Sequence, residues 1–324
     1  MRILFISLGC DKNLVDSEEM LYLLREKGYE ITDDEENADI IVVNTCCFIH
    51  DAKEESIDTI LEMGKYRLSG KVKALIVTGC LAQRYREEIL KEIPEVDAVL
   101  GTASYDDILE AVEKTLKGEK YLSFRPTDRL VDTGGGRIIT TGGAYEYLRI
   151  AEGCAKHCTY CVIPKVRGGY RSIPMERLLD TARQMVGEGV KELIVIAQET
   201  TLYGTDLYGK KSLHILLEKL CRIEGLVWIR LLYCYPEEIY PELVDTIARE
   251  PKICHYLDLP IQHCSDSILK RMGRKTTKAD LERIITEIRE RIPDMVIRTT
   301  LITGFPGETK EDHEELMQFV ADMA

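Results

Sequence analysis

The sequence predicts an α/β protein of two domains, a Rossmann-like parallel sheet followed by a truncated TIM-like (βα)6 barrel. Its 324 residues exceed what one hydrophobic core usually serves. Short runs rich in Ile, Val and Leu alternate with amphipathic helical patterns, as in parallel sheets that helices cover on both faces. A glycine-rich stretch interrupts this alternation once, and we expect the domain boundary there.

The first predicted domain comprises residues 1–125. Four apolar runs are its expected strands, namely Arg2–Leu8, Ala38–Val43, Ala74–Thr78 and Ala98–Leu100. Three helical patterns lie between them, at Ser17–Lys27, Ala52–Met63 and Gln83–Lys91. Because the strands are apolar almost throughout, both faces of this sheet should be buried.

Residues 126–143 are expected to form a linker, since five of the chain's 23 glycines fall within them. The second domain, residues 144–324, resumes the alternation. Its expected strands are Glu146–Ala151, Glu192–Ala197, Val227–Leu232, Tyr256–Leu259 and Val296–Thr303. Five strand–helix units without a long break predict an incomplete TIM-like barrel.

The C-terminal residues predict that the chain is a fragment. Thr309 and Asp312 form a capping-box pattern that begins a helix. The chain then stops at Ala324 with no Gly, Asn or Pro to end that helix. We therefore expect at least one further barrel strand to be missing.

Composition and charge exclude several classes of protein. With 45% hydrophobic and 31% charged residues, the chain should be globular rather than disordered. No apolar run approaches the roughly 18 residues of a membrane helix, so we expect no membrane association. The net charge is −13, and residues 1–125 alone carry sixteen basic and twenty-six acidic side chains. This balance argues against gripping nucleic acid by phosphate neutralisation alone and fits a basic protein partner.

The cysteine count indicates a reducing location. The segment Arg2–Cys10 is too short for a signal peptide and lacks a basic start. Eleven cysteines without a signal peptide predict a cytoplasmic protein, in which metal or catalytic roles outrank disulfides.

The strongest single pattern is the triad Cys154, Cys158 and Cys161, spaced CxxxCxxC directly after the first strand of the second domain. Barrel active sites lie at that end of the strands. Three thiolates at this spacing can bind three irons of a 4Fe–4S cluster and leave the fourth iron open. Zinc is the competing metal, although structural zinc usually takes four ligands.

A second triad is spread over the first domain. Cys10, Cys46 and Cys80 each follow an apolar strand, and the carboxyl ends of parallel strands meet at one edge of a sheet. We therefore expect the three sulfurs to lie together as a cluster site. Cys47 alternates to the other side of the chain and is the weaker candidate.

The CxxxCxxC pattern with Tyr160 before its last cysteine resembles the signature of the radical S-adenosylmethionine (SAM) superfamily. The resemblance implies that SAM binds the open iron and that an electron cleaves it to methionine and a 5′-deoxyadenosyl radical. The two triads, the linker, GCDKNLVDSE at 9–18 and GFPGET at 304–309 together resemble the methylthiotransferase family. This implies two 4Fe–4S clusters, with the auxiliary one on Cys10, Cys46 and Cys80.

Within that family the chain is similar to the ribosomal-protein type, called RimO-like, rather than the tRNA type, called MiaB-like. It reads GCDKN at 9–13, where the tRNA type typically reads GCQMN, and LPIQHCSD at 259–266, where that type tends to read LPVQSGSD. The resemblance implies methylthiolation of an aspartate β-carbon on small-subunit ribosomal protein twelve. Methylthiolation of a tRNA adenosine is the alternative, and a zinc-stabilised binding module is the alternative from another class.

The resemblance also implies partners. They are the small-subunit ribosomal protein, an electron donor such as flavodoxin or ferredoxin, and nucleic acid contacted through the family's C-terminal TRAM domain. That domain is expected to be absent from this chain.

Four residues at predicted strand ends are candidates for SAM binding by the resemblance, namely Gln198, Glu199, Gln262 and Arg298. Arginine suits bidentate contact with a carboxylate such as that of SAM. The competing interpretations are a loop that leads into a helix for Gln198 and Glu199, and a barrel ion pair for Arg298. The basic residues Lys165, Arg167 and Arg171 after the cysteine loop predict either a substrate contact or a solvated face.

Overall fold

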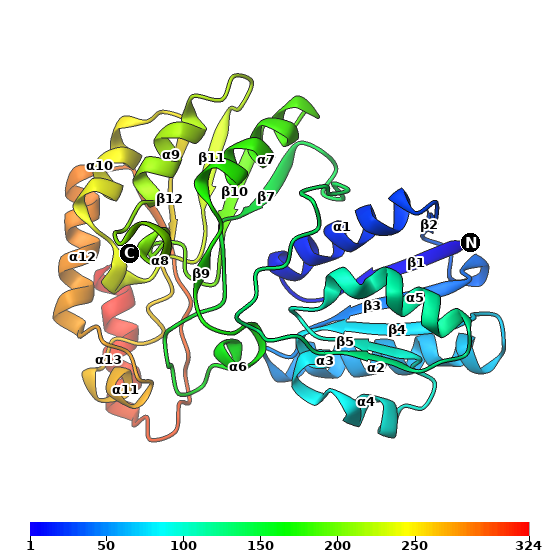
Figure 1. The fold of residues 1–324 in the computed structure, drawn as a ribbon. Helices are drawn as coiled ribbons and strands as arrows, with labels where there is room; N and C mark the ends of the chain where they lie inside the picture. Colours follow the sequence, from blue (N-terminus) through cyan, green and yellow to red (C-terminus); the bar gives the residue numbers. More distant parts are fainter. Residues whose placement is uncertain (324) are drawn as a thin grey trace. The chain divides into compact units, whose positions relative to one another are not determined.

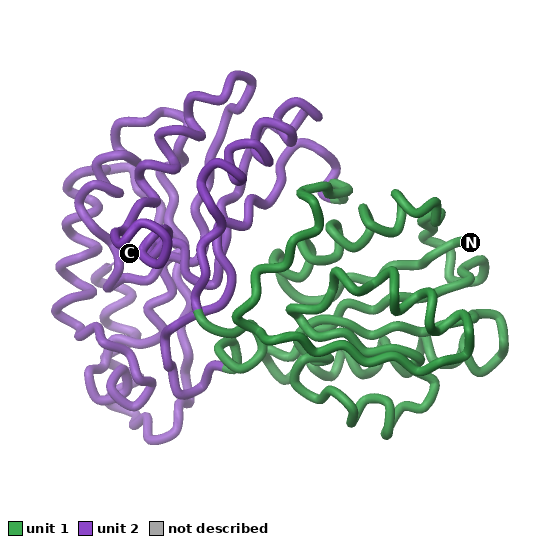
Figure 2. The backbone as a smooth tube through the Cα atoms, in the orientation of Figure 1, with its two compact units in different colours: residues 1–140, 162–169 green, residues 141–161, 170–324 purple. Residues whose placement is uncertain are grey.

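The computed structural model describes residues 1–323 and divides into two compact units (Figure 2). The first unit contains Met1–Thr140 and Val162–Gly169. The second contains Thr141–Cys161 and the chain from Tyr170 onward. The sequence-based division places 162–169 in the second domain, whereas this short segment is part of the first unit.

The first unit is built on a six-stranded sheet of order β2-β1-β3-β4-β5-β6, in which every pair is parallel. Its strands are β1 Arg2–Ser7, β2 Glu30–Thr32, β3 Ile40–Thr45, β4 Ala74–Gly79, β5 Ala98–Leu100 and β6 Tyr121–Ser123. Its helices are α1 Asp11–Glu26, α2 His50–Leu68, α3 Cys80–Tyr85, α4 Glu87–Glu92, α5 Ile108–Leu116 and α6 Ile163–Arg167.

Both faces of this sheet are buried, as the apolar strands predict. Ile40 and Val42 pack with α1 and α5 on one face, and Ile41 and Val43 pack with α2 and α3 on the other (Figure 1). Successive residues of a strand point to opposite faces, so one continuous apolar run supplies both layers. The Rossmann-like N-terminal sheet is thereby confirmed.

Three features of the first unit differ from the sequence prediction. The edge strands β2 and β6 are only three residues long and largely outside the core, so they lack an apolar run. Helix α1 begins at Asp11 rather than Ser17, because its first turns bury polar side chains such as Asn13 and Asp16. The predicted helix at 83–91 is broken at Arg86, whose φ is 47°, into α3 and α4.

The second unit has a five-stranded parallel sheet of order β13-β12-β11-β10-β7. Its strands are β7 Tyr145–Arg149, β10 Glu192–Ile196, β11 Trp228–Leu231, β12 Ile253–Asp258 and β13 Val296–Arg298. A small antiparallel pair, β8 Ala151–Glu152 with β9 Arg171–Ser172, stands apart from this sheet. The strands follow one another in chain order, as in an arc of a (βα) barrel.

Helices alternate with these strands (Figure 1). They are α7 Met175–Gly187, α8 Thr205–Tyr208, α9 Leu213–Cys221, α10 Pro241–Arg249, α11 Asp266–Arg271, α12 Lys278–Arg291 and α13 Lys310–Asp322. The predicted capping box of the last helix is present, with the Thr309 hydroxyl accepting from Asp312 N–H and the Asp312 carboxylate accepting from Thr309 N–H. Over residues 1–323, the chain contains no helix with the length and apolar character needed to cross a membrane.

Two candidate cysteine sites

The first site lies at the carboxyl edge of the six-stranded sheet. Cys10 is the N-cap of α1, Cys46 directly follows β3, and Cys80 begins α3 directly after β4. The strands β1, β3 and β4 are neighbours in the sheet, so the structure brings these three cysteines to one edge.

Two glycines allow the close approach of these strand ends. A Cβ added at Gly9 would lie 2.6 Å from the Cβ and 2.9 Å from the Sγ of Cys46, and Gly9 has φ +88°. A Cβ added at Gly79 would lie 2.3 Å from the Asn44 side-chain oxygen. Any larger residue would push the cysteine-bearing loops apart.

The buried amide of Asn13 ties the same loops together. Its Nδ2 donates to the Leu8 carbonyl after β1 and to the Thr45 carbonyl at the end of β3, both at 2.9 Å. Its Oδ1 lies 3.7 Å from Cys80 Sγ. One side chain therefore connects the ends of all three cysteine-bearing strands.

Burial dominates the protonation of Cys46 and Cys80. It raises the pKa of Cys46, and it raises the pKa of Cys80 to about 12, while the nearby Arg167 guanidinium acts in the opposite direction on both. Ligand thiols lose their protons when they bind metal. Cys47 instead packs in the apolar core with α2 and α3, which fits its interpretation as a core residue.

The second site is the loop that follows β8. Cys154 and Cys158 are buried, and Cys161 is half-buried. Lys156 N–H donates to Cys154 Sγ at 3.4 Å, and Thr159 N–H donates to the Met272 carbonyl just after α11 at 3.0 Å. These bonds hold the loop in a compact turn at the carboxyl end of the barrel strands. Burial raises the pKa of Cys154 to about 11.

An aromatic and cationic shell surrounds Cys158. The Tyr235 hydroxyl lies 3.9 Å from Cys158 Sγ, and the Arg274 guanidinium stacks over the Tyr235 ring at 4.4 Å. Arg274 also lies 3.6 Å from a carboxylate oxygen of Glu237. Tyr235 and Arg274 reach the loop from distant parts of the chain, so their contacts with Cys158 and with each other cannot be read from local sequence.

Gln198 and Glu199 follow β10 and are buried. Gln198 Nε2 donates to Glu152 at 2.6 Å. One oxygen of Glu199 accepts from the backbone N–H and the hydroxyl of Thr201, and its Oε2 has no hydrogen-bond partner among the described residues. Burial raises the pKa of Glu199 to about 8, although Lys156 acts to lower it. This open, buried acceptor suits a cationic ligand group.

Gln262 and Arg298 lie at the ends of neighbouring barrel segments. Gln262 has φ +71°, a left-handed conformation that is uncommon outside glycine. It pairs with Leu301 in an isolated parallel β-bridge. Arg298 lies 3.3 Å from Asp258, and its side chain is 59% exposed. The barrel ion pair is therefore present, and the guanidinium also faces open space.

The cysteine positions do not match a site for a single zinc ion. At a Zn–S bond of about 2.3 Å, two sulfurs on one ion lie at most about 4.6 Å apart. Within the described residues, neither triad has its three sulfurs all within 4.8 Å of one another. A polynuclear iron–sulfur cluster distributes its thiolates over several irons, so a donor set of three cysteines fits that group.

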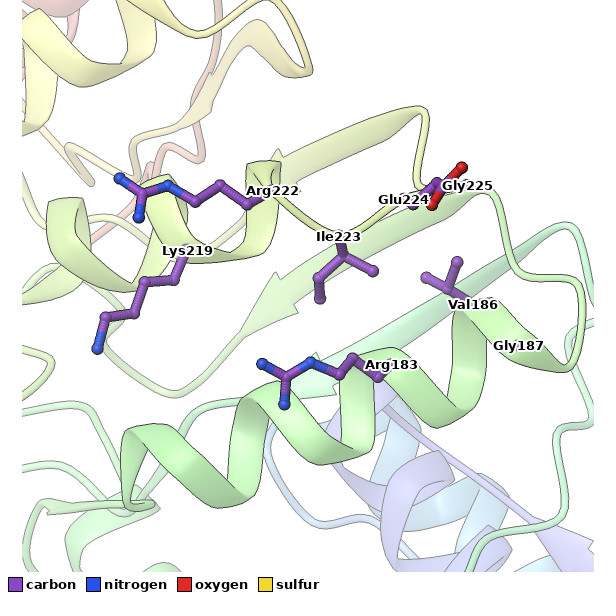
Figure 3. Close-up of a pocket in the computed structure, with 8 residues that line it drawn as sticks. All are labelled: Arg183, Val186, Gly187, Lys219, Arg222, Ile223, Glu224 and Gly225. Carbon is purple, nitrogen blue, oxygen red and sulfur yellow. The ribbon is translucent and has the colours of Figure 1, made fainter.

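A surface hollow of about 400 Å³ lies at the opposite end of the barrel strands. Arg183, Lys219 and Arg222 line it near the ends of α7 and α9, with Val186 and Ile223 between them (Figure 3). Cations at helix C-termini interact favourably with the helix dipole. The residues that line the hollow precede β10 and β11 in the chain, and none of them is a candidate site residue.

Replacing Glu199 by Gln should stabilise the folded chain at high pH. A buried acid with a pKa near 8 takes up a proton on folding, so its cost to stability grows as the pH rises from about 4.5 to 8. The variant should gain roughly 1–4 kcal/mol at pH 8, at about 1.4 kcal/mol per pKa unit, and almost nothing at pH 4.5. Urea unfolding at both pH values measures this. An equal gain at both would contradict the ionisation argument.

Comparison with known proteins gives consistent matches over the whole chain. Residues 2–101 match the family model described as "Uncharacterized protein family UPF0004", and residues 148–320 match the radical SAM superfamily. A protein from Lachnoclostridium phytofermentans named "Ribosomal protein uS12 methylthiotransferase RimO" is 66% identical over 323 residues, which cover 100% of this chain and 73% of that one. A protein of the same name from Clostridium tetani is 52% identical, covering 98% and 71%.

Solved structures support the fold. The radical SAM methyltransferase TsrM from Kitasatospora setae aligns with a TM-score of 0.70 at 15% identity, covering 99% of this chain and 71% of that one. The cobalamin-dependent SAM radical enzyme OxsB aligns with a TM-score of 0.67 at 13% identity, covering 98% and 51%.

Proposed function

The chain belongs to the RimO family of radical SAM methylthiotransferases, and we propose that its two cysteine triads hold two 4Fe–4S clusters with different tasks. The chain is a transferase that uses SAM and an iron–sulfur cluster and methylthiolates ribosomal protein uS12. The observation that carries the proposal is that each unit presents three cysteines at the carboxyl ends of parallel strands or in the loop after them. Three thiolates leave one iron of a 4Fe–4S cluster open in each unit.

The proposed ligands are Cys10, Cys46 and Cys80 for the auxiliary cluster, and Cys154, Cys158 and Cys161 for the SAM-cleaving cluster. When bound, the clusters supply an electron for SAM cleavage and a place for the sulfur that is transferred. The electron comes from a small carrier protein of the flavodoxin or ferredoxin type. The acceptor is the β-carbon of an aspartate on the ribosomal protein.

The chain's own residues orient SAM. With SAM bound, the open Oε2 of Glu199 would accept a hydrogen bond from an N–H of the SAM amino group, which would satisfy this buried oxygen. Gln198 is fixed by Glu152, and its buried amide oxygen, which has no hydrogen-bond partner among the described residues, is a second acceptor for SAM. Gln262 contacts SAM from the neighbouring rim, and Arg298 pairs with the SAM carboxylate as a bidentate donor.

The negative charge of the first unit is complementary to the positive charge expected of a ribosomal protein. Residues 1–125 have ten more acidic than basic side chains, and a basic ribosomal protein is attracted to such a surface. This contribution is expected to weaken as the salt concentration rises.

Mass spectrometry of the substrate tests the proposed function. The iron-loaded chain, SAM and a chemical reductant are incubated without oxygen with purified uS12, and in parallel with unmodified tRNA. We expect one aspartate peptide of uS12 to gain the mass of a methylthio group in place of hydrogen, and the tRNA to remain unchanged. A uS12 variant with that aspartate replaced is the control. Modification of tRNA adenosine with unchanged uS12 would contradict the proposal.

A further inference from the structure

The segment Val162–Gly169 places an arginine beside the first cysteine site. It follows Cys161 directly, yet it belongs to the first unit. Val166 packs in the apolar core of that unit, and the Thr102 hydroxyl donates to its carbonyl. Gly168 has φ +75°, and a Cβ added there would lie 2.4 Å from the Thr127 carbonyl oxygen. The segment is therefore held closely.

Arg167 is buried at the end of this segment. Its side chain is 4% exposed, so the basic stretch at 165–171 is not simply a solvated face. Its Nη1 donates to Asp16 at 2.7 Å and its Nη2 donates to Asn13 Oδ1. Its Nε donates to Cys80 Sγ at 3.4 Å. All four residues belong to the first unit.

The nitrogen atoms of the guanidinium have two different tasks. Asp16 balances the buried positive charge, which would otherwise be costly, and Asn13 fixes the plane of the group. The Nε–H is thereby directed at the sulfur of a cysteine at the edge of the sheet. A hydrogen bond from a cation to a thiolate is strong, whereas a neutral thiol is a weak acceptor. The geometry therefore suits a Cys80 that is a metal-bound thiolate.

We infer that Arg167 is a positioning residue for the auxiliary cluster, whose Nε–H bond to the Cys80 ligand raises the cluster's reduction potential. The inference rests on the proposed function, because it takes Cys80 as an iron ligand. Hydrogen bonds to ligand sulfurs, net charge and solvent exposure set the potentials of such clusters. The reduced cluster has more electron density on its sulfurs than the oxidised one. The Nε–H of Arg167, held in place by Asp16, therefore forms a stronger hydrogen bond with the reduced cluster and favours it.

The test is a redox titration of the first site alone. The parent is the full chain with Cys154, Cys158 and Cys161 replaced by Ala, loaded with iron and sulfide, and its midpoint potential is measured by electron paramagnetic resonance. In the parent with Arg167→Met, we expect the ratio of reduced to oxidised cluster at a fixed potential to fall roughly tenfold, a shift of about 59 mV for one electron. Arg167→Lys keeps a positive charge to pair with Asp16 but lacks the directed Nε–H. The midpoint potential of this variant should therefore shift in the same direction as in Arg167→Met, by a smaller amount.

Arg67→Met is the matched control, since Arg67 also forms an Nε ion pair, with Asp97 at 2.7 Å in the same unit, away from the cysteines at the other edge of the sheet. It should leave the midpoint unchanged. Iron-loaded Arg167 variants with the parental midpoint would overturn the inference. Loss of the fold in both Arg167 variants, seen by circular dichroism of the iron-free chains, would overturn it in favour of a structural role. A parent that binds no iron would instead overturn the proposed function.

Discussion

A chain in which Cys10, Cys46 and Cys80 are all replaced by alanine is expected to cleave SAM at close to the original rate and to form no methylthio product. The three side chains lie at the edge of one sheet in the first unit, whereas the SAM-cleaving triad is in the second unit. Without the first triad, the transferred sulfur has no iron to hold it. Product should fall at least about 100-fold, since even changes outside the ligand shell of a metal site cost 10- to 100-fold.

Two measurements on the same reaction mixture check this expectation. Chromatography quantifies 5′-deoxyadenosine, and mass spectrometry quantifies modified uS12. Cys47→Ala is the control, because Cys47 is adjacent to the site but packs in the core, and it should retain product. Product formation by the triple variant would remove the auxiliary site from the mechanism.

Replacing Cys154, Cys158 and Cys161 together by alanine should abolish SAM cleavage altogether. Their loop is fastened by Thr159 to the last residue of α11 and to the residue after it. These backbone acceptors are unchanged by the substitutions, so the barrel should remain folded. The cluster in the first unit should persist, leaving about half of the original iron if each triad holds a 4Fe–4S cluster. Iron analysis and the 5′-deoxyadenosine assay together measure this result.

Cys254→Ala provides the matched control for the second unit. Cys254 lies near the start of β12, at the opposite end of the barrel strands from the cysteine loop, and its removal should change neither iron content nor SAM cleavage. Residual 5′-deoxyadenosine in the triple variant would show that other residues hold the SAM-cleaving iron.

The sequence predicted those parts of the fold whose pattern is local. Buried strands such as β3 and β4 are continuous apolar runs, and Thr309 and Asp312 form the capping box where expected. The edge strand β2 was not predicted, because Glu30–Thr32 is too short and too exposed to show an apolar run. The break at Arg86 was not predicted either, because a left-handed arginine has no sequence signature.

In the candidate sites, too, the residues with a local sequence pattern could be predicted, whereas contacts between distant residues could not. The cysteines could be found because iron–sulfur clusters are held mainly by cysteine thiolates, and the spacing of the cysteines or their position after strands is visible in the sequence. The buried contacts of Asn13 and Arg167 could not be predicted, because they join residues far apart in sequence. Arg167 is expected from the sequence either to contact substrate or to lie on a solvated face, and it does not lie on a solvated face. Glu199 was singled out by its position after a strand, but its open oxygen depends on tertiary burial.

The return of Val162–Gly169 to the first unit bears on how the protein is synthesised. Domains generally fold from the N-terminus as the chain emerges from the ribosome. Here the first unit stays incomplete until α6 has been made, since Val166 fills its core and Arg167 contacts Asp16. A fragment ending in the glycine-rich stretch would lack both. The N-terminal sheet is therefore expected to complete its core only after the CxxxCxxC loop and α6 have been translated.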